Sequence, residues 1–161
     1  MLKKTAVLAF VLLTTYGCST IQSLDKESQG GAVALSFAPL ETHAVMYLYR
    51  DRDSHFGLFT LDIYINEHTV TTSPRCFVRV ELEPGSYFIE ADHPDMLGFE
   101  DELTLTAEAG QLKFYEYKPI SRFVVPGETK IIKRSKEEAM ANITEQNLCI
   151  SPLVRLSATE D

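Results

Sequence analysis

The chain has 161 residues, of which 23 are acidic and 15 are lysine or arginine, and its formal net charge at neutral pH is −8. Binding to nucleic acid requires clustered basic side chains that displace counterions. The nearest basic group, at residues 130–136, is followed directly by Glu137 and Glu138 and is better explained as a solvated face. Nucleic acid is therefore not an expected partner.

The first 18 residues are typical of an export signal. Lys3 and Lys4 precede an apolar run at residues 6–13, which is too short to cross a bilayer, and Gly17 precedes Cys18. A charged start, a short apolar run and a small residue at the cut are the marks of a secretory signal peptide. A cysteine just after that cut resembles the lipobox of bacterial lipoproteins, which implies removal of residues 1–17 and acylation of Cys18. The alternative is ordinary secretion with a free Cys18 thiol.

The lipobox resemblance also implies a location. Ser19 rather than an aspartate follows Cys18, which in such lipoproteins favours the periplasmic face of the outer membrane. The mature chain would keep 13 basic and 23 acidic side chains, a net charge near −10. Anionic headgroups repel such a domain, so membrane contact is expected through the acyl chains on Cys18 alone. Residues 18–31 are polar and contain two adjacent glycines, which predicts a flexible tether.

The remaining residues, 32–161, have a length suited to one domain. Apolar and polar side chains alternate at residues 59–65 and 76–82, the pattern of half-buried strands. Further strands are predicted at residues 33–38, 44–50, 69–71, 87–92, 102–107, 112–118 and 129–133. Many short strands at regular spacing predict a mainly β domain, a small antiparallel β-sandwich.

Turn residues and one helix complete this prediction. Residues 66–68 and 108–111 can reverse the chain, and Pro84-Gly85 predicts a tight turn with a positive φ at Gly85. These turns suggest successive antiparallel hairpins. Ser135 and Glu138 form a potential capping box, so a single C-terminal helix is expected at about residues 135–146, covering an open face of the sandwich.

Two cysteines remain besides Cys18. Cys76 and Cys149 form an even pair in an exported chain, which favours a disulfide. Cys76 also shares the apolar face of its predicted strand with Val78 and Val80, where a buried free thiol would pack equally well. The sequence leaves both alternatives open.

Four segments carry a resemblance to a known family. They are residues 44–50 (AVMYLYR), 61–66 (LDIYIN), 82–87 (LEPGSY) and 107–110 (AEAG). Their order and spacing resemble an uncharacterised family of bacterial lipoproteins, which is similar to PEGA-type and transthyretin-like β-sandwich modules. The resemblance implies a fold and brings no catalytic residues with it.

No segment predicts a reaction, a metal or a cofactor. Asp51, Asp53 and His55 superficially resemble a calcium loop, but an EF-hand needs glycine and glutamate where this chain has Phe56 and Asp62. A polar hairpin loop is the better interpretation. The sequence also has no GxSxG, HExxH or phosphate-binding glycine motif. We therefore expect no catalytic residues and no enzyme activity.

Tyrosines provide the candidate binding surface. Tyr47 and Tyr49 share one face of a predicted strand, and Tyr115 and Tyr117 share a face of another. If both faces belong to one sheet, the four rings would form an aromatic platform for a glycan or a protein. The alternative is that these rings pack in the core with their hydroxyls at the surface.

The function expected from the sequence is a non-catalytic binding or structural lipoprotein, held at the outer membrane and facing the periplasm. Its partner would be an envelope protein or the cell wall. One alternative is an accessory lipoprotein subunit of an envelope or secretion assembly, which rests on analogy of fold alone. The other alternative is an enzyme of a type that the sequence does not reveal.

Overall fold

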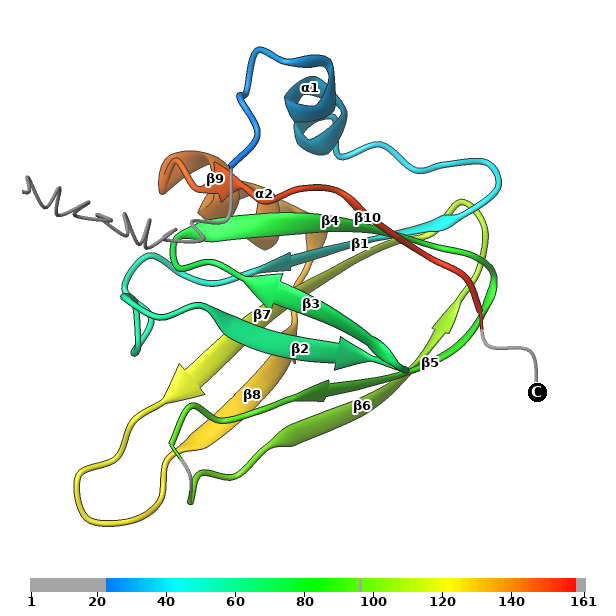
Figure 1. Ribbon diagram of the computed structural model, residues 1–161. Coiled ribbons are helices and arrows are strands. Elements are labelled where there is room, and N and C mark those ends of the chain that lie inside the picture. The colour runs from blue at the N-terminus through cyan, green and yellow to red at the C-terminus, as the bar shows by residue number, and fades with distance from the viewer. Residues whose placement is uncertain (1–22, 96, 159–161) are drawn as a thin grey trace, which may run out of the picture.

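The computed structural model describes residues 23–95 and 97–158. Within these residues the protein is mainly β, as predicted, with two sheets and two helices (Figure 1). The predicted signal peptide at residues 1–17 and the predicted lipid attachment site, Cys18, lie outside the described residues.

The first sheet has the strand order β10-β4-β1-β7-β8, and β9 pairs with the start of β4. Its strands are β1 (Ala44–Tyr49), β4 (Cys76–Leu82), β7 (Leu112–Ile120), β8 (Glu128–Lys133), β9 (Cys149–Ile150) and β10 (Val154–Leu156). The second sheet has the order β3-β2-β5-β6. It contains β2 (Leu61–Ile65), β3 (His68–Thr72), β5 (Gly85–Ala91) and β6 (Asp101–Ala107). The helices are α1 (Gln29–Leu35) and α2 (Lys136–Glu145).

The first sheet is buried on both faces. Every residue of β1 is buried, in contrast to β2, where buried and half-buried residues alternate. Met46 and Leu48 of β1 belong to the core that the two sheets share. Tyr47 points to the opposite face and packs with Phe37 and side chains of α2 in a second core. The protein therefore has three layers, with the helices covering the outer face of the first sheet.

Strand direction differs from the antiparallel prediction. β1 and β7 are parallel neighbours, and β9 and β10 both run parallel to β4. Only some of the predicted turns make hairpins: the turn at Asn66 joins the paired strands β2 and β3, whereas Pro84 leads the chain from the first sheet to the second. The alternation of apolar and polar side chains along a strand shows which of them face inward, but it does not show which strand is its neighbour. The antiparallel prediction was wrong for this reason.

Gly85 does not have the predicted positive φ. Among the described glycines only Gly110 does, at 81°, in the turn expected at residues 108–111. Gly85 is required for a different reason, because a Cβ there would lie 2.6 Å from the Cβ of Ala158. The glycine allows the C-terminal segment to cross close over the corner between the sheets.

The N-terminal segment is also different from the prediction. Residues 33–38 were expected to form a strand, yet α1 begins at Gln29 after Ser28, whose side chain accepts a hydrogen bond from the Gly31 N–H at 3.0 Å. The described part of the expected tether, residues 23–31, lies against the domain instead. Leu24 bridges to Ile150, and Gly31 is buried so closely that a Cβ would lie 2.1 Å from the Asp25 carbonyl oxygen.

The predicted C-terminal helix is confirmed as α2. The Ser135 side chain accepts the Glu138 N–H at 3.2 Å, and the Glu138 carboxylate accepts the Ser135 N–H at 3.2 Å, which completes the capping box. Ala139 and Ile143 are its buried residues. They pack on the outer face of the first sheet, the open face that the helix was expected to cover.

The structure joins Cys76 and Cys149 in a disulfide, which settles the alternative that the sequence left open. The two residues are register partners where β9 pairs with β4, and their Cα atoms are 4.3 Å apart. The bond ties the segment after α2 to the start of a central strand.

Arg79 attaches the N-terminal segment to the first sheet. It is a fully buried cation, and it donates hydrogen bonds to the Val33 carbonyl at 3.2 Å, the Tyr47 hydroxyl at 2.9 Å and the Glu81 carboxylate at 3.1 Å. Arg155 donates to the other Glu81 oxygen at 2.7 Å. Burial alone would raise the pKa of Glu81, but the two arginines outweigh it and hold this pKa below its ordinary value of 4.5.

Replacing both Cys76 and Cys149 with alanine should lower the free energy of unfolding. The bridge spans a sequence separation of 73 residues, for which the loss of loop entropy in the unfolded chain gives about 4 kcal/mol. Urea unfolding of the variant and of the oxidised protein measures the difference. The reduced wild type should resemble the variant, and equal stability of the variant and the oxidised protein would contradict the assignment.

Glu81→Gln should destabilise the protein most at neutral pH, because it removes the charge that pairs with the buried Arg79. The cost of breaking such a pair is about 3 kcal/mol. The Glu81 pKa is lower in the folded than in the unfolded chain, so its stabilisation is complete above about pH 4.5 and is lost as pH falls through the folded-state pKa. Urea unfolding between pH 7 and pH 3 should show the wild type converging on the variant. A gap independent of pH would argue against this pairing.

Candidate binding surface at the loop end

The predicted tyrosine platform does not exist. All four tyrosines are buried, Tyr47, Tyr49 and Tyr117 completely. β1 and β7 pair in parallel with Tyr47 opposite Phe114 and Leu48 opposite Tyr115, so the two tyrosine pairs face opposite sides of the first sheet. Tyr47 stacks on Phe114 with ring centroids 5.1 Å apart, whereas Tyr115 and Tyr117 join the core between the sheets. The alternative interpretation, core packing, is the correct one.

Exposed apolar side chains gather elsewhere, on three loops at one end of the molecule (Figure 1). We call these loops the loop end: residues 50–60 between β1 and β2, residues 92–95 and 97–100 between β5 and β6, and residues 121–127 between β7 and β8. Nine large apolar residues are exposed in the described chain, and the loop end holds seven of them: Leu58, Phe59, Leu97, Phe99, Phe123, Val124 and Val125. Exposed apolar residues that gather at one end of a protein mark an interaction site more often than scattered ones do.

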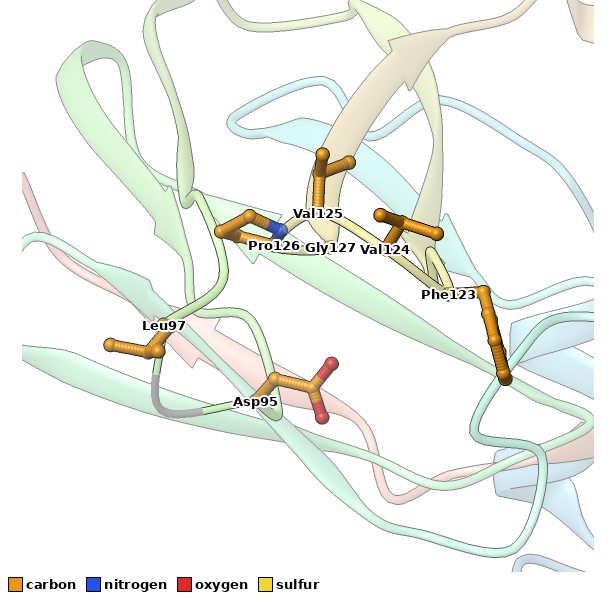
Figure 2. Close-up of a pocket in the computed structure, with 7 residues that line it drawn as sticks. All are labelled: Asp95, Leu97, Phe123, Val124, Val125, Pro126 and Gly127. Carbon is orange, nitrogen blue, oxygen red and sulfur yellow. The ribbon is translucent and has the colours of Figure 1, made fainter.

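Two of the loops enclose an open hollow of about 480 Å³. Figure 2 shows residues 123–127 along one side and Asp95 and Leu97 on the other. Asp95 is the only ionisable side chain of this lining. Phe123 is fully exposed and Val124 is 89% exposed, so these side chains project from the loop instead of packing beneath it.

His93 supports the loops from below. It is buried, its ring meets the ring of Phe56 edge-on at 5.4 Å, and its Nδ1 accepts the Asp95 N–H at 3.1 Å. The Nε2 lies 3.3 Å from the Ile120 carbonyl oxygen, so this pattern places the proton on Nε2, which donates. One imidazole thereby contacts residues of all three loops. It fits because a glycine, Gly127, lies against the ring.

Arg50 fixes the loop between β1 and β2. It is fully buried, and it donates to the Phe59 carbonyl at 2.6 Å and to the Phe56 carbonyl at 2.9 Å. Its guanidinium lies 5.9 Å from the centroid of the Tyr117 ring, a cation–π arrangement. Burial lowers the pKa of Arg50. Its two hydrogen-bond acceptors are neutral carbonyl oxygens, which stabilise the cation less than a carboxylate would. The backbone below Leu58 and Phe59 is therefore held while their side chains stay exposed.

The residues of the rejected calcium motif serve the same loops. The Asp51 carboxylate accepts the Asp53 N–H at 2.9 Å and the Gln146 side-chain amide at 3.1 Å, and His55 Nδ1 accepts the Ser121 N–H at 2.9 Å. The predicted loop is thus present, but it is not the hairpin that was expected, because β1 and β2 belong to different sheets. These hydrogen bonds tie the first loop to the end of α2 and to the loop between β7 and β8.

Three other acids converge, which the sequence did not predict. Ligand atoms of Glu90, Asp92 and Glu100 lie within 4.8 Å of one another beside the loop end, and each residue is at least partly exposed. Partial desolvation and then the charges of Glu100 and Asp92 raise the pKa of Glu90. Exposed acids of this kind are common without an ion. Glu90 and Asp92 are two residues apart, so the sequence alone suggests that they share a face. The approach of Glu100 depends on the pairing of β5 with β6.

Sequence reasoning missed the loop end itself. Phe99 and Phe123 lie in segments without periodicity. Phe59 falls within the alternating segment at residues 59–65, but the strand begins only at Leu61. The sequence does contain a signal for these loops. Turns are usually polar, whereas two loop segments hold apolar runs, Gly57-Leu58-Phe59 and Phe123-Val124-Val125. The roles of Arg50 and His93 depend on contacts between loops that are distant in sequence.

No protein-family model matches the sequence, and no curated protein matches it. The resemblance to a lipoprotein family therefore stays a prediction. Within the described residues, neither helix has the length and apolar character needed to cross a bilayer.

Gly127→Ala should destabilise the loop end. A Cβ at this position would lie 2.4 Å from Cε1 of His93 and 2.7 Å from the Ile120 carbonyl oxygen, so both loops must shift. Overpacking of this kind costs about 1–3 kcal/mol. Gly30→Ala is the matched control, because its Cβ meets only side-chain atoms at 3.4 Å or more and the change favours α1. Thermal unfolding should move in opposite directions for the two variants, and a neutral Gly127→Ala would show that His93 does not anchor this loop.

Proposed function

We propose that this chain is a lipid-anchored envelope lipoprotein that acts as a non-catalytic binding or structural module. In this proposal a signal peptide precedes Cys18, acyl chains on Cys18 hold the protein at the periplasmic face of the outer membrane, and a small β-sandwich is its body. The loop end is the surface through which the module makes contact with the envelope.

The observation that carries the proposal is the concentration of exposed apolar side chains on the loop end. Seven of the nine large exposed apolar residues of the described chain lie there, on three loops that His93 and Arg50 hold from below. A supported backbone that presents apolar side chains is suited to binding, since the loops themselves need little ordering when a partner is met.

The composition of the hollow supports binding more than catalysis. Its lining offers one carboxylate, Asp95, among apolar side chains and backbone. Acid–base or nucleophilic catalysis needs at least two polar groups within reach of one reacting atom. An apolar contact needs only the surface itself. The disulfide between Cys76 and Cys149 suits the oxidising compartment that the signal peptide implies.

A photo-crosslinking residue tests the contact surface in cells. Placed at Phe123 of the full chain, it should form adducts with envelope components, because that side chain is fully exposed on the loop end. The matched control is the same residue at Phe88, which is exposed on β5 but outside the loop end. Equal adduct formation at both positions, or none at either, would contradict the proposed surface.

The anchor is checked on the same purified protein. Its intact mass should correspond to a chain that begins at Cys18 and carries acyl groups. Replacing residues 1–18 with a cleavable secretory signal should move the protein from washed membranes to the soluble periplasmic fraction. A mature protein with an unmodified Cys18 thiol would overturn the lipoprotein assignment and leave the crosslinking result to stand by itself.

A further inference from the structure

The described chain begins beside the loop end. Leu24 donates its N–H to the Ile150 carbonyl at 2.7 Å, and the Lys26 ammonium donates to the Asn147 side chain. Ile150 pairs with Phe77 at the start of β4, which is also where β1 ends and runs into its loop. Figure 1 shows the blue N-terminal segment passing beside β9.

A series of contacts joins this start to two of the loops that carry the apolar tips. Asn147 follows directly after Gln146, whose side chain accepts the Arg52 N–H at 2.7 Å and donates to Asp51 at 3.1 Å. The same loop then reaches the loop between β7 and β8 through the hydrogen bond from Ser121 to His55. The start of the domain and the loop end therefore form one side of the molecule.

The chain between this side and the proposed anchor is short. Only five residue steps separate Ser23 from Cys18, and a fully extended chain spans at most about 3.6 Å per residue, so the reach is roughly 18 Å. A lipid on Cys18 therefore keeps the side that carries the loop end within reach of the bilayer.

The form of the loop end suits a bilayer. Its apolar residues project singly from three loops: Phe123 is fully exposed, Val124 is 89% exposed and Leu58 is 89% exposed. A protein partner would need a complementary shape to bury such tips, whereas the acyl boundary accommodates any outline. Tethering also makes the encounter intramolecular, at an effective concentration of about millimolar, so a weak insertion suffices.

Two arginines of the loops have acidic neighbours, so they do not give the tips a net positive charge. Arg122 beside Phe123 pairs with Glu128 at 2.5 Å, and Arg52 lies between Asp51 and Asp53. We infer that the loop end rests on the lipid bilayer that carries the anchor, with its apolar tips inserted among zwitterionic headgroups. This inference names the partner of the proposed contact surface and rests on the proposed lipidation of Cys18.

Single tryptophan probes test the inference, because the chain has no tryptophan of its own. The lipidated protein carrying Phe123→Trp or Phe59→Trp is reconstituted into phosphatidylcholine vesicles whose acyl chains are brominated. Both probes should shift their emission to shorter wavelength and lose most of it to quenching, because two different loops reach the same surface. Phe88→Trp, exposed outside the loop end, should show neither change.

Flotation of the same vesicles separates this inference from the proposed function. Protein that floats with unshifted and unquenched Phe123→Trp and Phe59→Trp emission is anchored without docking, which overturns the inference alone. Adducts with one defined protein in cells, combined with that result, would assign the loop end to a protein partner. Protein that does not float at all lacks the lipid anchor, and the proposed function then fails together with the inference.

Discussion

The rest of the structure depends on the first sheet being buried on both faces. A strand such as β1, in which both alternating sets of side chains are apolar, cannot leave either face in water. One face packs on the second sheet, and the other must be covered by something else. The chain provides α1, Phe37 and α2 for this purpose, and they come from its two extremes. The N-terminal segment is therefore part of the fold, which is why the described residues after Ser23 do not behave as a tether.

Burial of the first sheet also buries charge, and its two fully buried arginines have different partners. Arg79 has a carboxylate partner in Glu81, and it links this partner to the Val33 carbonyl of α1. Arg50 has carbonyl oxygens and an aromatic ring, so its burial is compensated only when the loop holds those carbonyls in place. A cation that needs two carbonyls from one loop determines the shape of that loop. The exposed side chains of Leu58 and Phe59 are thus set on a fixed backbone.

Properties that depend on local sequence could be predicted, and those that depend on partners distant in sequence could not. The capping box of α2 and the alternation of β2 are local, and the structure has both. Tyr47 and Tyr115 show the limit: each was correctly placed on a strand, but one residue of register between β1 and β7 puts them on opposite faces. Residues 33–38 are apolar apart from Ser36, which suits a buried strand, yet Ser28 caps a helix whose small residues allow close packing on the domain. His93 carries no sequence signal at all, because its neighbours come from three separate loops.

The position of the acidic residues limits how deeply the loop end could enter a membrane. Glu90 lies on β5, and Asp92 and Glu100 lie at the two ends of the loop between β5 and β6, next to the second sheet. Partial desolvation and then the charges of Glu100 and Asp92 raise the pKa of Glu90, so the ionised form of this group is already disfavoured here. Anionic headgroups would add to this effect, while zwitterionic headgroups would not. The same acids therefore favour contact by the tips alone and oppose burial of the second sheet. Such a shallow contact orients the domain on a surface without replacing the lipid as its anchor.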